Sequence, residues 1–105
     1  MARSIETKDD VFAVLRTHRE RIRALGVKRL GIFGSFARSE QTAHSDLDVL
    51  VEFEEGQKTF DRFMDLAFLL EDALERRVDL LTPDALCAHL RASVLGEVEY
   101  ASLAA

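Results

Sequence analysis

The sequence predicts a small α/β domain of the α+β kind, in which a mixed β-sheet is flanked by helices. Two observations carry this prediction. Segments with helical spacing and short apolar runs follow one another in the order helix, strand, strand, helix, strand, helix. The chain has 105 residues and no repeat, linker or low-complexity segment, so we expect one domain over residues 1–105. The order of the strands within the sheet stays open.

The first half of the chain predicts a helix, a strand and a turn. The helix is expected over residues 8–25, with Thr7 as its cap and Gly26 at its end. Its apolar residues share one stripe: Val11, Leu15, Ile22 and Leu25. "KRLGIFG", residues 28–34, predicts a short strand that ends in glycine, and "SFARSE" then begins a turn or a short helix.

The second half predicts two more strands and two helices. "LDVLVEF", residues 47–53, is apolar and β-branched, which is typical of a strand. Residues 59–75 form the clearest helix. Its expected core-facing stripe consists of Phe60, Phe63, Met64, Ala67, Leu70 and Leu74. "RRVDLLT", residues 76–82, predicts a third strand, and Thr82 and Pro83 are expected to cap and begin a last helix. The apolar residues that continue this helix are Leu86, Leu90, Val94 and Val98.

Charge and size limit the classes of function. The formal net charge of −5 argues against a general nucleic-acid binder, which normally carries a basic stripe, so we expect no direct nucleic-acid binding. A nucleotide ligand remains compatible with this charge, because a metal ion can bridge acidic groups to phosphate. A domain of this size buries only about 60–65% of its unfolded surface, which makes a hetero-oligomer or a homodimer a plausible state.

The cysteine content and the hydropathy pattern indicate a cytoplasmic location. The single cysteine, Cys87, excludes an internal disulfide and fits a reducing compartment. Its helical surroundings, "DALCAHL", predict a packed, small apolar side chain. The N-terminus lacks the apolar core of a signal peptide, and no apolar run approaches the roughly 18 residues of a membrane span, so we expect no membrane contact.

Two aspartates, Asp46 and Asp48, stand one residue apart at the head of the second strand. At this spacing both side chains project from one face of a strand, where two unpaired carboxylates repel each other. A divalent cation removes that repulsion, and Mg²⁺ is commonly held by one or two carboxylates together with substrate phosphates. A third acid, Asp79, lies in the third strand between apolar neighbours, so three carboxylates converge if that strand lies beside the second one.

Upstream of the acids, Gly34 and Ser35 occupy the turn that follows the first strand. Glycine lets the backbone approach a ligand closely, and exposed N–H groups at such a turn favour phosphate. The Ser35 hydroxyl adds a hydrogen-bonding group, and Arg38 stands where a guanidinium can bind phosphate through two hydrogen bonds. The pattern therefore predicts a phosphate-binding turn next to a metal-binding acid pair.

Other interpretations of these residues remain open. Asp46 also suits a turn, and Asp79 also suits a structural ion pair with Arg76 or Arg77. "SDLDVL" is similar to the nucleophile motif of haloacid-dehalogenase-like phosphatases, but that motif follows an apolar strand, and here the strand follows the motif. An EF-hand calcium loop needs an acidic or amide residue and then glycine where this chain has two apolar residues.

Taken together, "GSFARSEQTAHSDLDVLVEF" and "RRVDLLT" resemble the minimal nucleotidyltransferases of the DNA-polymerase-β-like superfamily, which are often paired with a HEPN-domain protein. The resemblance extends from about residue 28 to the end of the chain and implies the polymerase-β-like nucleotidyltransferase fold. It implies that Gly34 and Ser35 hold a nucleotide triphosphate, and Arg38 matches a position where the family often has arginine. The usual glycine after that arginine is Ser39 here, which puts the local turn geometry in doubt.

The same resemblance implies an activity. Asp46 and Asp48 correspond to the metal-binding pair and Asp79 to the third catalytic acid, with two Mg²⁺ ions as cofactors and ATP as the nucleotide. The implied reaction moves AMP from ATP to a hydroxyl on a partner protein, so that the chain would be the antitoxin that adenylylates a HEPN toxin. Two alternatives stay open: a non-catalytic antitoxin that acts by occlusion, and nucleotidylation of a small molecule at a dimer interface.

Overall fold

The computed structural model describes residues 5–103. The single-domain prediction also covers residues 1–4 and 104–105, which lie outside the described range. Five helical segments and four strands make up the described part of the chain. They are α1 (Lys8–Thr17), α2 (Arg19–Ala24), β1 (Val27–Phe33), β2 (Leu47–Phe53), α3 (Phe60–Leu74), β3 (Val78–Leu81), the 3₁₀ turn η1 (Pro83–Ala85), α4 (Ala88–Glu97) and β4 (Glu99–Tyr100). No described helix has the length and apolar character needed to cross a bilayer.

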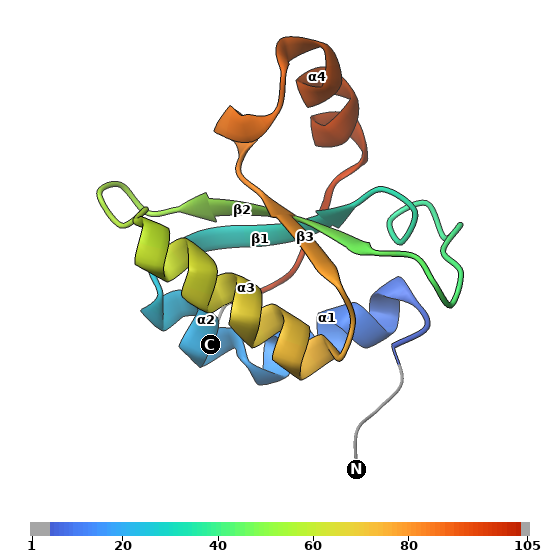
Figure 1. Ribbon diagram of the computed structural model, residues 1–105, viewed down its shortest axis with the longest axis horizontal. Helices are drawn as coiled ribbons and strands as arrows, with labels where there is room; N and C mark the ends of the chain where they lie inside the picture. The colour runs from blue at the N-terminus through green and yellow to red at the C-terminus, as the bar shows by residue number, and fades with distance from the viewer. Residues whose placement is uncertain (1–4, 104–105) are drawn as a thin grey trace.

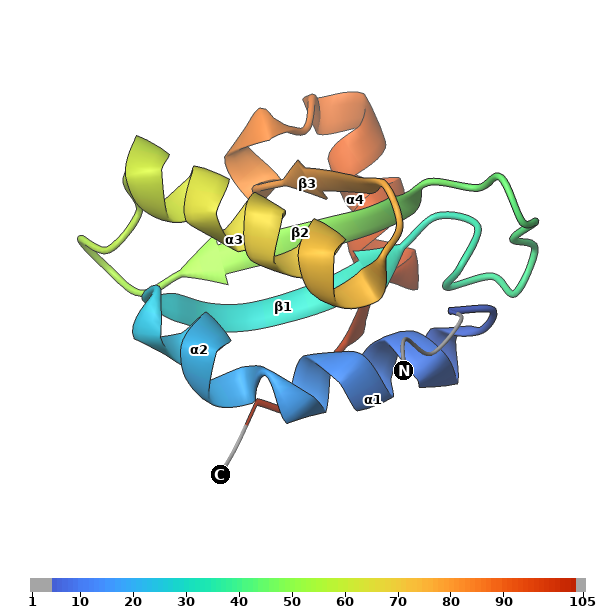
Figure 2. The same ribbon diagram turned by 60° about the horizontal axis from the view of Figure 1, so that its bottom comes forward.

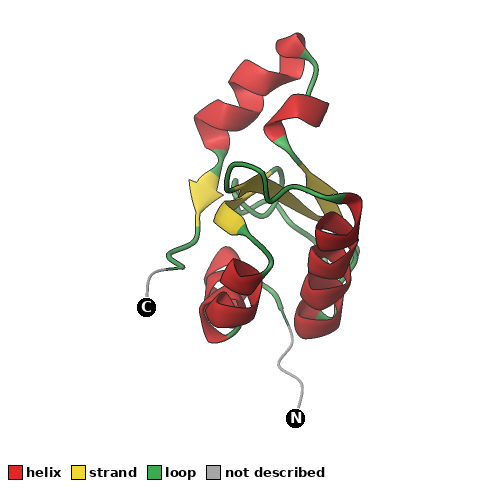
Figure 3. Cartoon of the chain, turned by 90° about the vertical axis from the view of Figure 1, so that its left-hand side faces the viewer, coloured by secondary structure: helices red, strands yellow, loops and turns green. Residues whose placement is uncertain are grey.

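The four strands form one mixed sheet in the order β3-β2-β1-β4. β1 runs antiparallel to both of its neighbours, and β2 runs parallel to β3, with α3 as the crossover between them. Figures 1 and 3 show that α1, α2 and α3 cover one face of this sheet and that α4 lies on the other. The expected α+β fold with a mixed sheet flanked by helices is confirmed.

The two faces of the sheet carry hydrophobic cores of different size. The larger core fills the space between the sheet and the helices α1 to α3, and its fully buried members include Leu15, Ile22, Leu30, Ile32, Leu66 and Leu70. The smaller core lies under α4 and consists of Phe33, Leu50, Leu86 and Val94. Side chains alternate between the two faces along a strand. A strand that contributes side chains to the larger core therefore also has side chains on the face toward α4.

The predicted helix over residues 8–25 is two helices, interrupted at His18. Side chains bind carbonyl oxygens around this interruption: the Thr17 hydroxyl donates to the Ala13 carbonyl at 3.1 Å and the Arg19 guanidinium to the Arg16 carbonyl at 2.9 Å. Such side-chain bonds compete with the helical hydrogen-bond ladder and bend helices. The predicted cap is confirmed, because the Thr7 hydroxyl accepts from a backbone N–H in a complete capping box.

The long helix α3 is confirmed, but its predicted core-facing stripe is partly wrong. Phe60 is 78% exposed, because it is the first helical residue and precedes the turns that pack on the sheet. The side chains of α3 that are buried all lie from position 66 onwards: Leu66, Leu69, Leu70 and Leu74. The helix therefore packs through its C-terminal half.

The predicted last helix, from Thr82 through position 98, is also corrected. The chain forms the 3₁₀ turn η1, breaks at Leu86 and Cys87, and starts α4 only at Ala88. The Thr82 side chain makes no capping hydrogen bond. Cys87, expected to be packed in a helix, is exposed at the N-terminal end of α4, because the break turns the Leu86 side chain into the smaller core in its place.

The sequence did not predict β4, which has only two residues. It pairs with Gly31 and Ile32 of β1. Gly31 permits this pairing, because a Cβ atom at this position would lie 2.7 Å from Val98 Cγ2 and 2.9 Å from Tyr100 Cδ1. The close approach fixes the C-terminal end of α4 against the sheet.

The corrected packing of α3 generates a stability prediction. Leu70→Ala should lower the free energy of unfolding by about 2–4 kcal/mol, because it leaves a cavity in the larger core. Phe60→Ala should change it by no more than about 0.5 kcal/mol, since the ring is exposed. Urea titrations of the two variants measure both values, and equal losses would contradict the packing described here.

Candidate functional site

Two of the three predicted acids, Asp48 and Asp79, lie on the face of the sheet that α4 covers. Asp48 of β2 stands opposite Asp79 of β3 in the parallel register, so their Cα atoms are about 4.8 Å apart. Leu50 and Leu81, two residues further along each strand, contact the smaller core, so the alternation of side chains points both aspartates toward the same face. Asp46 immediately precedes β2, two residues before Asp48.

The acids make no ion pair in the described part of the chain. Within residues 5–103, none of the three carboxylates makes a hydrogen bond or an ion pair with another residue. Burial, followed by the charges of Asp79 and Asp46, raises the pKa of Asp48 from its ordinary 3.8 to about 6, and Arg38 offsets only part of this rise. The face therefore carries negative charge that the described residues leave unbalanced.

The turn after β1 is built against the Asp48 carboxylate. Phe33, the last residue of β1, pairs with Asp48, and Gly34 follows with a φ of +74°. A Cβ atom at Gly34 would overlap Asp48 Oδ2, so both the backbone angle and the neighbouring carboxylate require glycine here. The loop between β1 and β2 then projects from one end of the sheet, as Figure 2 shows.

The predicted Ser35 and Arg38 lie in the same turn, which is not a helix. The Arg38 N–H donates to the Gly34 carbonyl at 3.1 Å, which closes the turn. Ser35 is half-buried, and its hydroxyl makes no hydrogen bond with any residue that the structure describes. Ser39, which stands where the family usually has glycine, adopts a left-handed φ of 58°. The turn thus keeps the backbone angle that glycine favours.

The sequence analysis missed Glu97, the last residue of α4. Its Oε1 accepts a hydrogen bond of 2.8 Å from the Gly34 N–H, and its Oε2 lies 3.1 Å from Arg38 Nη1. Arg38 Nε also binds Glu40 at 2.8 Å. These carboxylates raise the pKa of Arg38 above its ordinary value. Glu97 is far from both partners in sequence, so no local spacing signals the contact.

Arg76, which the sequence analysis considered only as a partner of Asp79, holds the loop that precedes the acid pair. Its guanidinium donates to the carbonyl oxygens of Ser45 at 2.8 Å and Ile5 at 2.6 Å, and it lies 5.0 Å from the ring centre of Phe36. The alternative role considered for Arg76, an ion pair with Asp79, is therefore not what its hydrogen bonds show. The sequence feature that could have drawn attention to this position is the pair of consecutive arginines, Arg76 and Arg77, just before the third strand.

The acids fit a magnesium ion that is shared with a ligand. Within residues 5–103, no three His, Cys, Asp or Glu side chains lie close enough together to hold a metal ion by themselves. Carboxylate oxygens are nevertheless the ligands that Mg²⁺ prefers, and this ion is commonly completed by substrate phosphates and water. The unbalanced charge around Asp48 favours a cation at this place.

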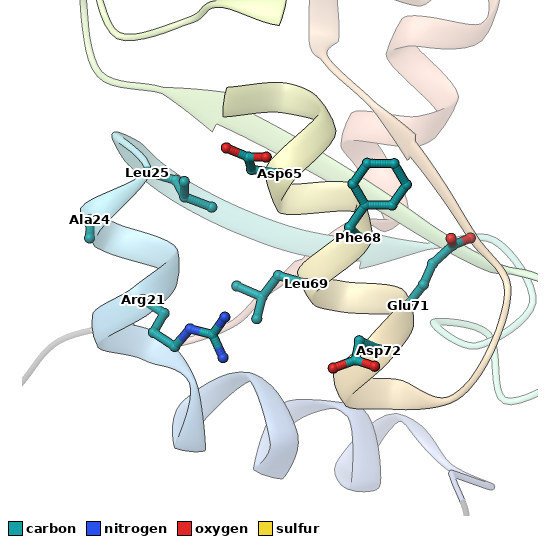
Figure 4. Close-up of a pocket in the computed structure, with 8 residues that line it drawn as sticks. All are labelled: Arg21, Ala24, Leu25, Asp65, Phe68, Leu69, Glu71 and Asp72. Atoms are coloured by element: carbon teal, nitrogen blue, oxygen red, sulfur yellow. The ribbon is translucent and has the colours of Figure 1, made fainter. Parts of the chain in front are cut away.

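A pocket on the opposite layer carries none of these residues. Figure 4 shows it between α2 and α3. Its lining combines apolar and charged side chains: Arg21, Ala24, Leu25, Asp65, Phe68, Leu69, Glu71 and Asp72. Because the sheet separates it from the acids, it takes no part in the arrangement described above.

The contact between Gly34 and Asp48 predicts the effect of adding one methyl group. Gly34→Ala should cost more stability than Gly56→Ala, which shares a positive φ of 77° but has open space around its added Cβ. The shared backbone strain costs about 1 kcal/mol, and only Gly34→Ala must also displace the carboxylate. Urea unfolding measures the difference, and NMR titration of Asp48 checks its displacement. Equal costs with an unmoved Asp48 would refute the contact.

The raised pKa of Asp48 predicts how stability depends on pH. The folded chain holds this proton more tightly than the unfolded chain, so the free energy of unfolding should fall as pH rises from about 4 to about 7. Relative to Asp48→Asn, this loss should be about 1 kcal/mol, because solvent screens a half-exposed group. Thermal melts of both proteins across this range provide the measurement, and parallel curves would contradict the assignment.

Comparison with known proteins agrees with the geometry. The family model described as a nucleotidyltransferase domain matches residues 15–101. Protein adenylyltransferase MntA of Thermococcus cleftensis is 37% identical over 95 residues, which cover 90% of this chain and 95% of that protein. A solved structure assigned as a minimal nucleotidyltransferase has a TM-score of 0.68 at 39% identity, covering 84% of this chain and 93% of that chain.

A more distant solved structure shares the fold. It is described as a tri-AMPylated Shewanella oneidensis HEPN toxin in complex with an MNT antitoxin, and the match has a TM-score of 0.53 at 20% identity, covering 80% of this chain and 68% of that chain. The family match and the MntA relative place the chain by sequence, and the solved structures place it by fold. The chain therefore belongs to the nucleotidyltransferase domain family, among the minimal nucleotidyltransferases, and is an enzyme of nucleotidyltransferase type.

Proposed function

We propose that this protein is a Mg²⁺-dependent protein adenylyltransferase that transfers AMP from ATP to a hydroxyl group of a partner protein. The observation that carries the proposal is the set of Asp46, Asp48 and Asp79 beside the Gly34 turn, which make no hydrogen bond or ion pair with the described residues. The relative named protein adenylyltransferase MntA supports AMP as the transferred group and a protein as the acceptor.

The turn residues bind the nucleotide in this proposal. The Gly34 N–H, the Ser35 hydroxyl and the Arg38 guanidinium donate hydrogen bonds to the triphosphate, which orients the α-phosphorus over the acids. Asp46 and Asp48 would hold one Mg²⁺, and Asp79 would contribute to a second. Bound magnesium neutralises phosphate charge and lowers the pKa of a coordinated hydroxyl.

The transfer forms one bond and breaks one. The acceptor oxygen bonds to the α-phosphorus in line, and the bond between the α-phosphorus and pyrophosphate breaks. The proton of the acceptor hydroxyl passes to Asp79, whose exposed carboxylate faces the same side as Asp48. The donors of the turn stabilise the charge on the departing pyrophosphate.

The acceptor is proposed to be a HEPN toxin, which makes the chain an antitoxin. The solved neighbour in which an MNT antitoxin lies in complex with a tri-AMPylated HEPN toxin supports this choice. Modification of the partner, rather than occlusion alone, follows from the three acids that are all present in this chain.

Label transfer tests the proposal. With α-labelled ATP, Mg²⁺ and the product of the neighbouring gene, label should move to the partner. Asp46→Asn, Asp48→Asn and Asp79→Asn should each slow transfer at least about 100-fold, because each removes a carboxylate from the reacting centre. Removal of Mg²⁺ with a chelator should stop it. Asp72→Asn, in α3 on the opposite layer, is the matched control and should transfer normally.

The other outcomes identify the rival functions. Tight binding of the partner without label, unchanged in the aspartate variants, would replace the enzyme by a binding module that acts through occlusion. Label on a small molecule and none on protein would indicate the small-molecule reaction.

A further inference from the structure

Glu97 occupies the hydrogen-bond donors that a triphosphate needs. Its Oε1 takes the single hydrogen of the Gly34 N–H at 2.8 Å, and its two oxygens lie 3.3 Å and 3.1 Å from Arg38 Nη1. The side chain comes from the end of α4, on the same face of the sheet as the acids, and its charge contributes to the raised pKa of Asp48. A carboxylate of the chain itself therefore stands where the phosphate-binding turn is open to an anion.

We propose that Glu97 is an internal competitor that sets the affinity for the nucleotide, an inference that rests on the proposed function because it concerns the same turn. The Gly34 N–H has one hydrogen, so a phosphate oxygen gains it only when Glu97 Oε1 leaves. A carboxylate that stayed in place would also repel the triphosphate. Nucleotide binding thus exchanges an internal anion for an external one.

The exchange needs only a rotation of the Glu97 side chain. Val94 in α4 is buried in the smaller core, and Val98 packs against that core, so the backbone on both sides of Glu97 is held. The Glu97 side chain itself is 27% exposed and has solvent into which it can turn. α4 and β4 therefore keep their packing while the donors of the turn become free.

Glu40 has a different relation to the same arginine. It binds Arg38 through Nε and makes no contact with the Gly34 N–H, so it leaves Nη1 available to a phosphate. Glu40 thus orients the guanidinium, whereas Glu97 competes for it. The two carboxylates should respond in opposite directions when each loses its charge.

Titration calorimetry with ATP and Mg²⁺ tests the competition. Glu97→Gln and Glu97→Ala should bind ATP about 10-fold more tightly than the unchanged protein, since a charge-assisted contact no longer has to break. Glu40→Gln should bind ATP more weakly, because the guanidinium loses the carboxylate that orients it. Glu99→Gln, which removes a neighbouring carboxylate paired with Lys8, is the matched control and should bind as the unchanged protein does.

A second measurement needs no nucleotide. Amide hydrogen exchange at Gly34 should be slow in the unchanged protein and faster in Glu97→Ala, while thermal melts show whether the variant is folded. Equally fast exchange in both folded proteins would overturn the contact on which the inference depends.

The outcomes separate this inference from the proposed function. If the unchanged protein binds ATP and both Glu97 variants bind it equally or more weakly, competition is refuted and nucleotidyl transfer stands. If Glu97→Gln binds ATP tightly and no label reaches a partner, competition stands and the proposed transfer fails. If no variant binds ATP, both are refuted.

Discussion

The carboxylate of Asp48 is the group on which the arrangement of this site depends. It is half-buried, it stands beside Asp79 in the parallel register of β2 and β3, and it contacts the backbone of Gly34 at the end of β1. A shift of one residue in either strand pairing would turn it to the opposite face of the sheet. The register of three strands therefore decides whether the acids and the Gly34 turn meet at all.

The larger hydrophobic core and the acids lie on opposite faces of the sheet. The face under α1, α2 and α3 buries the larger core and supplies most of the apolar contact. The face under α4 has only a small core, which leaves room along β2 and β3 for side chains that carry charge. Unpaired carboxylates would be costly in the larger core, and here they lie where solvent and a cation can reach them.

The sequence predicted what local periodicity determines. β2 begins and ends at the expected residues, and Asp48 faces the side opposite the larger core because alternation along a strand is a local property, whereas Asp46 lies just before the strand. The features it did not predict depend on contacts between distant positions. β4 needs the close approach at Gly31, and Glu97 reaches the turn only after α4 has docked on the sheet. The spacing of residues that are close in sequence therefore predicts neither contact.

The acids around Asp48 suit a cation, whereas the hydrogen-bond donors of the Gly34 turn suit an anion. The acids around Asp48 make no ion pair with the described residues, whereas the donors of Gly34 and Arg38 bind Glu97. A free anion would have to displace Glu97 and then face three carboxylates, and a free cation would meet the acids but leave the turn as it is. Under the proposed function, a nucleotide that arrives with its magnesium ion would satisfy both halves of the site at once, because the metal would compensate the acids and the phosphates would replace Glu97. The proposed metal–nucleotide complex therefore suits the charge pattern of this chain better than either component alone.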